Sequence, residues 1–184
     1  MNRLVFTANT SADGFINDAA GSFEWTVPEP EVHAFINDIE RPIATYLYGR
    51  RLWEVMRFWE TAGDGPDDSP ESRDYAQLWR AARKVVFSRT LLEVDTADTT
   101  LQSNFDPASI AAMKEGADGD ISIGGPTLAA AAFAAGLVDE CRLIVVPHVL
   151  GGGTPWAPRG MQVPLALVEE RRFPAGAVFL RYRV

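Results

Sequence analysis

The residues best suited to chemistry lie in a turn between a β-branched segment and an alanine-rich segment. Residues 121–138 read I-S-I-G-G-P-T-L-A-A-A-A-F-A-A-G-L-V, so Gly124, Gly125, Pro126 and Thr127 stand where a strand passes into a helix. Unpaired N–H groups and the positive end of the helix dipole attract anions there, and glycines let a phosphate approach the backbone. The turn therefore predicts binding of a phosphorylated ligand.

The same turn is also compatible with a purely structural role, because Gly-Gly before Pro126 is a common way to begin a helix. Its spacing is neither the G-x-G-x-x-G of a Rossmann fold nor the G-x-x-x-x-G-K-[S/T] of a P-loop. Both readings stay open for this turn taken alone.

Two further turns hold residues suited to phosphate. Gly49, Arg50 and Arg51 follow one β-like segment, and Ser88 and Arg89 follow another. Arginine suits phosphate because its guanidinium offers two parallel N–H donors. Ligands of open parallel sheets bind beyond the carboxyl ends of the strands, where such turns gather. The three turns together predict a dinucleotide held at several phosphates.

The charge and the metal-binding residue types exclude several classes of function. The net charge of −8 argues against a general nucleic-acid surface, which needs clustered Lys and Arg. Cys141 is the only cysteine, so no intramolecular disulfide forms, and His33 and His148 are the only histidines. We therefore expect no nucleic-acid partner and no metal.

The length and hydropathy of the chain predict one domain over residues 1–184. The 47% hydrophobic content is enough for a substantial core. No apolar run approaches the roughly 20 residues that span a bilayer, and the first ten residues do not resemble a secretory signal. We expect a cytoplasmic protein without a membrane partner.

The periodicity alternates between β-like and α-like segments, which is typical of an α/β sheet with helices on both faces. Ser11-Ala12-Asp13-Gly14 gives a hairpin-like signal after the first strand. Pro174-Ala175-Gly176 predicts an antiparallel hairpin at the C-terminus. Expected strands cover 4–9, 43–48, 84–88, 101–104, 121–123, 142–146, 165–172 and 178–184, and expected helices cover 29–39, a short segment after 49, 72–83, 107–115 and 126–135.

Six motifs in order resemble the dihydrofolate-reductase-like superfamily, and within it the C-terminal reductase domain of bifunctional riboflavin-biosynthesis deaminase-reductases. The motifs are S-A-D-G-F-I at 11–16, Y-G-R-R-L-W-E at 48–54, K-V-V-F-S-R-T-L at 84–91, I-S-I-G-G-P-T-L at 121–128, G-L-V-D-E at 136–140 and V-P-H-V-L-G-G-G-T-P at 146–155. The resemblance spans nearly the whole chain. It implies a mainly parallel, eight-stranded sheet with an antiparallel C-terminal hairpin, NADPH as the hydride donor, and a homodimer.

The resemblance also assigns the cofactor-binding residues. They are Ala8 and Ile16 at the nicotinamide, Gly49 and Arg50 at the phosphates with Arg51 nearby, Ser88 and Arg89 around the adenosine 2′-phosphate, and Gly124, Gly125, Pro126 and Thr127 at the pyrophosphate. Charge-assisted hydrogen bonds at the 2′-phosphate would favour NADPH over NADH. Where dihydrofolate reductases usually place a Thr, this chain has Leu52, so one hydroxyl contact is missing.

The chemistry implied by the resemblance is hydride transfer to a small heterocyclic, imine or carbonyl substrate. The protein would position the reacting carbon against the nicotinamide and exclude water. Asp13 and Glu31 are the candidate proton donors. Each residue is also compatible with a purely structural role: Asp13 as a turn residue before glycine, and Glu31 as an acidic residue in the first turn of a helix. Solvent is a third source of the proton.

The residues leave alternatives for the substrate and for the activity. The surroundings of Glu31, P-E-P-E-V-H-A-F, follow the pterin-binding pattern poorly, which leaves dihydrofolate reduction as a less favoured alternative. The basic set that a ribosyl phosphate would need is not identifiable, and no H-x-E or C-x-x-C pattern indicates a zinc deaminase domain. A non-catalytic NADPH-binding or nucleotide-binding protein is the other alternative.

Trp25, Trp53, Trp59 and Phe58 are candidates for a substrate site or for packing. Trp156, in G-G-G-T-P-W, is compatible with a position over a cleft or at a dimer contact.

Overall fold

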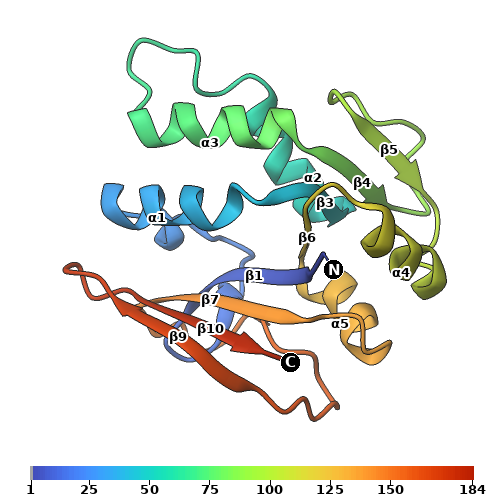
Figure 1. The fold of residues 1–184 in the computed structure, drawn as a ribbon. Helices are drawn as coiled ribbons and strands as arrows, with labels where there is room; N and C mark the ends of the chain where they lie inside the picture. Colours follow the sequence, from blue (N-terminus) through green and yellow to red (C-terminus); the bar gives the residue numbers. More distant parts are fainter. Residues whose placement is uncertain (1) are drawn as a thin grey trace.

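The computed structural model describes residues 2–184, and an eight-stranded sheet forms its centre (Figure 1). The strands lie in the order β5-β4-β3-β6-β1-β7-β10-β9. Their bounds are β1 Leu4–Ser11, β3 Ile43–Gly49, β4 Arg83–Phe87, β5 Thr99–Gln102, β6 Asp120–Gly124, β7 Glu140–Val146, β9 Ala166–Arg172 and β10 Val178–Arg183.

The strands from β5 to β7 run parallel, and only the C-terminal hairpin runs against them. All five pairings from β5 across to β7 are parallel, whereas β10 is antiparallel to both β7 and β9. The expected α/β fold, with its mainly parallel eight-stranded sheet and antiparallel C-terminal hairpin, is confirmed. Because the strands from β5 to β7 are parallel, their carboxyl ends meet at one edge of the sheet.

The five α-helices cover both faces of the sheet, α1 and α3 side by side on one and α4 and α5 on the other (Figure 1). Their bounds are α1 Pro30–Glu40, α2 Arg50–Met56, α3 Pro70–Ala81, α4 Pro107–Gly116 and α5 Pro126–Ala134, and two 3-10 helices cover η1 Glu24–Thr26 and η2 Arg57–Glu60. The 3-10 helix η2 contacts α2 and α3 on the same face of the sheet as α1.

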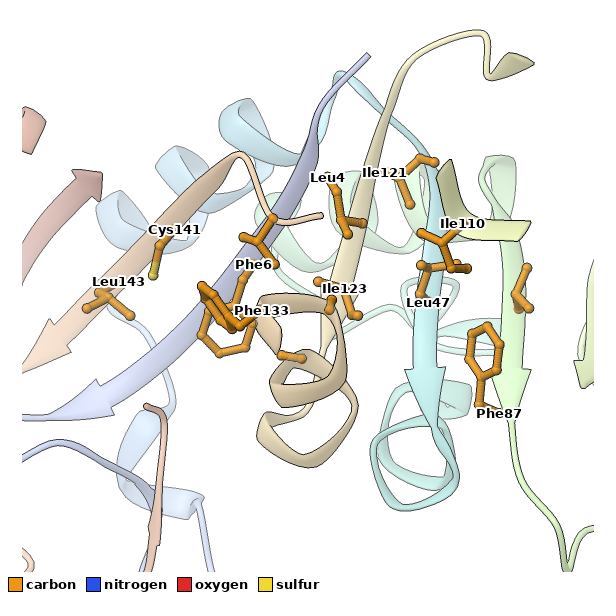
Figure 2. Packing of buried hydrophobic residues seen from close by; sticks show 14 residues of the cluster. Leu4, Phe6, Leu47, Phe87, Ile110, Ile121, Ile123, Phe133, Cys141 and Leu143 are labelled. Carbon is orange, nitrogen blue, oxygen red and sulfur yellow. The ribbon is translucent and has the colours of Figure 1, made fainter. Parts of the chain in front are cut away.

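The core follows from the alternation of side chains along the central strands. Leu4 and Phe6 of β1 point to the α4/α5 face with Ile121 and Ile123 of β6, and Phe133 of α5 packs on them (Figure 2). A second cluster lies beneath α2 and α3, and a third lies between α1 and the β7/β10 strands.

The helix ends confirm two cap assignments made from sequence. The Asp106 carboxylate accepts the N–H groups of Ala108 and Ser109 at the start of α4. At the end of α5, Gly136 adopts a φ of 64°, and the Leu137 N–H donates to the Ala132 carbonyl at 3.0 Å. This closing bond is the Schellman arrangement that favours glycine.

The strand after Gly14 corrects the hairpin indicated by Ser11-Ala12-Asp13-Gly14. The chain does turn there, with the Gly14 N–H donating to the Ser11 carbonyl at 3.0 Å. However, β2 (Phe15–Asn17) pairs with β8 (Thr154–Pro155) in a separate two-stranded sheet rather than with β1. The pairing is long-range, so the local turn signal could not reveal it.

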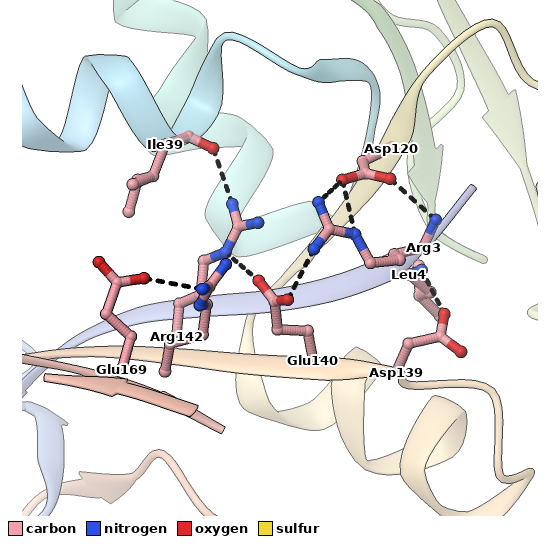
Figure 3. Close-up of polar contacts among 9 residues, drawn as sticks. Arg3, Leu4, Ile39, Asp120, Asp139, Glu140, Arg142 and Glu169 are labelled. Carbon is pink, nitrogen blue, oxygen red and sulfur yellow. Dashed lines mark hydrogen bonds and ion pairs between the residues drawn. The ribbon is translucent and has the colours of Figure 1, made fainter. Parts of the chain in front are cut away.

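A partly buried ionic network links the amino ends of the central strands, at the edge opposite their carboxyl ends (Figure 3). Arg3 bridges Asp120 of β6 and Glu140 of β7, and Glu140 also accepts a bond from Arg142 Nε at 2.6 Å. Arg142 is only 3% exposed. Its guanidinium also donates a hydrogen bond to the Ile39 carbonyl near the end of α1. The network ties β6, β1 and β7 to α1 at this edge.

Candidate active site

The carboxyl ends of β1 and β6 separate and open the centre of the sheet. Their ladder stops at the pair Phe6 and Ile123, whereas β1 continues beside β7 as far as the pair Ser11 and Val146. In Figure 2 the two strands lie close at Leu4 and Ile121 and diverge towards α5. The part of β1 beyond Phe6 therefore has no ladder partner on its β6 side.

The connections of these two strands leave in opposite directions. From β1 the chain passes through α1 to β3, and from β6 it passes through α5 on the other face to β7. Open α/β sheets bind ligands outside the carboxyl ends of the strands at such a switch in direction. The gap between β1 and β6 is therefore the candidate active site.

The three turns predicted to bind phosphate lie side by side at this edge. β4, β3 and β6 are neighbours, with Gly49 in register with Phe87 and Tyr48 in register with Gly124. The Arg50 guanidinium donates to the Thr90 hydroxyl at 3.1 Å, which joins the turn after β3 to the turn after β4. The three turns therefore lie together, as predicted from the sequence.

Gly124 and Gly125 have different structural reasons to be glycine. A Cβ on Gly124 would lie 2.3 Å from Leu52 Cδ2, so α2 packs directly on this backbone. Gly125 precedes α5 with a φ of 85°, in the region that L side chains rarely adopt. Where a Thr was expected from the resemblance, Leu52 makes an apolar contact instead, and this contact fixes α2 against the 124–127 turn.

The first turn of α5 offers free backbone donors. No side chain caps this helix within residues 2–184, and Pro126 occupies its first turn. Thr127 is exposed beside it. A helix N-terminus of this kind, next to two glycines and two arginine-bearing turns, fits the pyrophosphate of a dinucleotide.

The side chains of the two outer turns have distinct surroundings. Arg50, Arg51 and Arg89 are all exposed, and Arg50 is ion-paired with Glu54 at 2.7 Å. The Ser88 hydroxyl accepts the N–H groups of Thr90 and Leu91, so it shapes the turn that carries Arg89. Arg89 is thus a cation on a turn whose backbone is held by hydrogen bonds to Ser88.

The two residues expected at the nicotinamide both lie at the carboxyl end of β1. Ala8 belongs to the part of β1 without a β6 partner, and its side chain packs on the α5 side. Ile16 lies in β2, which turns back beside β1 through a bond from the Thr10 hydroxyl to the Phe15 carbonyl. Both are half-buried at the candidate site.

Asp13 braces a loop. Its carboxylate accepts the Ser11 hydroxyl at 2.7 Å and the N–H groups of Leu150 at 3.1 Å and Gly151 at 2.7 Å. These bonds, that of Ser11 foremost, lower the pKa of Asp13 from 3.8 to about 2. Asp13 is therefore a carboxylate at neutral pH, and the geometry favours a positioning role over the proton-donor role suggested by the sequence.

Glu31 also lacks the surroundings of a proton donor. It lies exposed on the first turn of α1, and its carboxylate pairs with Arg171 of β9 at 3.1 Å. Arg171 in turn stacks on Phe35 and Phe173. The pair joins α1 to the C-terminal hairpin, which favours a structural role and weakens the parallel with the pterin-binding carboxylate.

The loop after β7 also helps to shape the site, although none of its residues was assigned a functional role from the sequence. The G-G-G-T-P motif at 151–155 was the sequence signal that could have indicated this loop. A Cβ on Gly153, whose φ is 135°, would lie 1.9 Å from the Asn17 carbonyl oxygen. The Asn17 side chain accepts the Thr154 N–H at 3.0 Å. The glycine lets β8 approach β2, so the motif positions Ile16.

The aromatic candidates divide into buried and accessible groups. Trp53 is 2% exposed and Trp156 stacks on Phe6, so both serve in packing. Trp59 contacts His33 of α1 and Tyr75 of α3, and Trp25 lies 6.0 Å from His148 between ring centroids. Phe58 is 64% exposed beside Trp59.

No helix within residues 2–184 is long and apolar enough to cross a membrane. Across the same residues, no three His, Cys, Asp or Glu side chains gather as metal ligands would.

The fold and this edge define a reductase-like α/β domain of the dihydrofolate-reductase-like type. The family model described as the RibD C-terminal domain matches residues 2–179, and the chain belongs to that family. Because that family is the reductase domain of the riboflavin pathway, its match supports an oxidoreductase. The resemblance found in the sequence is confirmed.

One relative at the sequence level spans nearly the whole chain. The uncharacterized protein YyaP of Bacillus subtilis (strain 168) is 30% identical over 185 residues, which cover 98% of this chain and 94% of the relative.

Solved structures share the fold at low identity. A putative riboflavin biosynthesis protein from Shewanella sp. PV-4 superposes with a TM-score of 0.76 at 19% identity, covering 99% of each chain. A pyrimidine reductase-like protein from Corynebacterium diphtheriae gives 0.67 at 16% identity, covering 100% of this chain and 92% of the other. A Thermotoga maritima deaminase/reductase also gives 0.67, at 11% identity, but this chain covers only 56% of its length.

Proposed function

We propose that this protein is an NADPH-dependent reductase that transfers a hydride to a small heterocyclic, imine or carbonyl substrate. The observation that carries the proposal is the convergence of three phosphate-suited turns on the gap between β1 and β6. Family membership supports the same reading. We place the protein in the cytoplasm as a homodimer, on the resemblance of the family.

The cofactor would be held from both sides of the gap. Gly124, Gly125, Pro126 and Thr127 would hold the pyrophosphate at α5, with Gly49, Arg50 and Arg51 at the neighbouring turn. Ser88 and Arg89 would hold the 2′-phosphate, since a guanidinium on a braced turn suits a phosphate dianion. Ala8 and Ile16 would border the nicotinamide.

The reaction needs a hydride, which NADPH supplies when bound. The chain's contribution is positional: β1 and β2 hold Ala8 and Ile16 in place, and the Asp13 carboxylate fixes the loop of Leu150 and Gly151 against them. Because Asp13 and Glu31 are both engaged, we assign the proton to solvent or to the substrate itself. The proton is not drawn from either carboxyl.

The test is oxidation of NADPH by the purified protein, followed by its absorbance, with a panel of cyclic imines, carbonyl compounds and reducible heterocycles. The proposal expects at least one substrate to raise oxidation above the background and expects Arg89→Ala to reduce the rate at low NADPH. A matched Arg183→Ala variant, at the opposite edge of the sheet, should leave the rate unchanged.

A second candidate is a non-catalytic NADPH-binding or nucleotide-binding protein. The observation in its favour is that both carboxyls suggested as acids are engaged in structural contacts. It expects saturable NADPH binding and no oxidation above background with any member of the panel.

A further inference from the structure

Most of the large exposed apolar side chains lie in segments that follow the carboxyl ends of strands. Of the nine on the described chain, six lie in segments that follow the carboxyl ends of strands, and the other three lie on the C-terminal hairpin or at the last residue. The six are Phe23, Val27, Val55, Phe58, Leu92 and Val149. Exposed apolar surface collected at one site is typical of ligand binding rather than of solvent contact.

The apolar segments flank the gap between β1 and β6. Val55 and Phe58 belong to the connection that leaves β3, on the β6 side. Phe23 and Val27 border η1, which follows β2, and the contact of Trp25 with His148 ties η1 to the loop after β7. A substrate entering beside the nicotinamide would therefore meet apolar side chains on both sides.

The charges divide this edge into two halves. The cofactor half consists of the turns at 49–51, 88–90 and 124–127 and carries Arg50, Arg51 and Arg89. The substrate half consists of residues 12–33, 55–59 and 147–153. From 4 to 40 and from 143 to 158 the chain has no Lys or Arg, and residues 12–33 hold five carboxylic acids, Asp13, Asp18, Glu24, Glu29 and Glu31.

Arg57 and Arg171, two arginines that reach the substrate half, each have a carboxylate partner. Arg57 of η2 pairs with Asp95 and lies over the Trp53 ring. Arg171 of β9 pairs with Glu31. Each pair is neutral as a whole, so neither guanidinium adds net positive charge to the substrate half, and bringing a phosphate dianion near the remaining carboxylates is unfavourable.

We propose that the substrate half selects planar apolar substrates that lack a phosphate group and are neutral or cationic. This inference rests on the proposed function and narrows its substrate class. It sets the chain apart from a 5-amino-6-(5-phosphoribosylamino)uracil reductase, the activity in the name of its Thermotoga maritima structural neighbour. A protonated cyclic imine satisfies both conditions and brings its own proton, so hydride addition to its carbon leaves a neutral amine and needs no acid from the protein.

The test is equilibrium binding to the protein saturated with NADP⁺, measured by calorimetry. One pair of probes differs only in the phosphate: 5-amino-6-(5-phosphoribosylamino)uracil and its dephosphorylated form. A third probe, 3,4-dihydroisoquinoline, is planar, apolar and cationic when protonated. The proposal expects the dephosphorylated probe to bind about tenfold more tightly than the phosphorylated one, and expects dihydroisoquinoline to bind.

Two variants place the effect at the apolar segments. Phe58→Arg should weaken dihydroisoquinoline binding about tenfold and strengthen binding of the phosphorylated probe. Val184→Arg adds the same charge at the opposite edge of the sheet and should change neither. Equal effects of the two variants would overturn the assignment of Phe58.

The outcomes separate this inference from the proposed function. Failure of NADP⁺ to bind would overturn both. Saturation with NADP⁺ followed by equal or tighter binding of the phosphorylated probe, or by no binding of the other two, would overturn the substrate class alone.

Discussion

Replacing Gly124 by alanine tests the packing that brings the turns of the candidate site together. The new Cβ would lie 2.3 Å from Leu52 Cδ2 and 3.5 Å from the Tyr48 ring. Leu52 must then leave its rotamer or α2 must shift, and overpacking of this kind costs about 1–3 kcal/mol. For a chain of this length each kcal/mol lowers Tm by about 2–4 °C, so the expected loss is about 2–12 °C.

The same substitution should weaken NADPH binding. A shift of α2 carries Arg50 with it, and loss of one charge-assisted hydrogen bond to phosphate is worth about 1.5–3 kcal/mol, a factor of ten or more in Kd. Calorimetric melting and fluorescence titration with NADPH measure the two effects. The control is Gly116→Ala at the end of α4, where nothing lies within 4 Å of the new methyl group.

A double-mutant cycle isolates the cause. Leu52→Ala removes the Cδ2 atom, so Gly124→Ala should cost less in that background, with a coupling of about 0.5–3 kcal/mol. Additive effects of the two substitutions, or a Gly124→Ala variant as stable as Gly116→Ala, would refute the packing argument.

Three further predictions concern charges. Because folding lowers the pKa of Asp13 from 3.8 to about 2, its stabilising contribution is full above pH 3.8 and is lost as pH falls towards 2; Asp13→Asn should lower the urea midpoint at pH 7 and match the unsubstituted chain near pH 2. Arg142→Leu removes one of the two guanidinium groups that pair with the buried Glu140 and should cost clearly more in urea unfolding than Arg171→Leu, which breaks an exposed pair and should cost about 0–1 kcal/mol; equal costs would contradict the burial argument. Arg89→Ala should weaken NADPH binding at least about tenfold and leave NADH binding nearly unchanged, and equal losses in the two titrations would remove the 2′-phosphate assignment.

The element order and the convergence of the three turns could be predicted from local signals. Alternating apolar residues gave the strands, and turn residues marked the ends that meet at one edge of a parallel sheet. Several boundaries were misplaced: β5 covers Thr99–Gln102 rather than 101–104, and β7 begins at Glu140 rather than 142. For one other boundary the sequence signal was present. The third helix begins at Pro70 rather than 72, because the Ser69 hydroxyl accepts the Ser72 N–H and caps it.

The roles of the two carboxyls could not be predicted from local signals. Besides the nearby Ser11 hydroxyl, Asp13 accepts the N–H groups of Leu150 and Gly151, and Glu31 pairs with Arg171; these three partners are more than 130 residues away. The pairing of β2 with β8 is equally distant along the chain. Such contacts depend on where the sheet places the loops, which no short motif encodes.

The three turns are tested as a dinucleotide site by titrating the purified protein with NADPH and with NADH, followed by tryptophan fluorescence. We expect saturable binding of NADPH in the micromolar range and clearly weaker binding of NADH. Absence of binding by both cofactors would contradict the assignment of the three turns as a dinucleotide site.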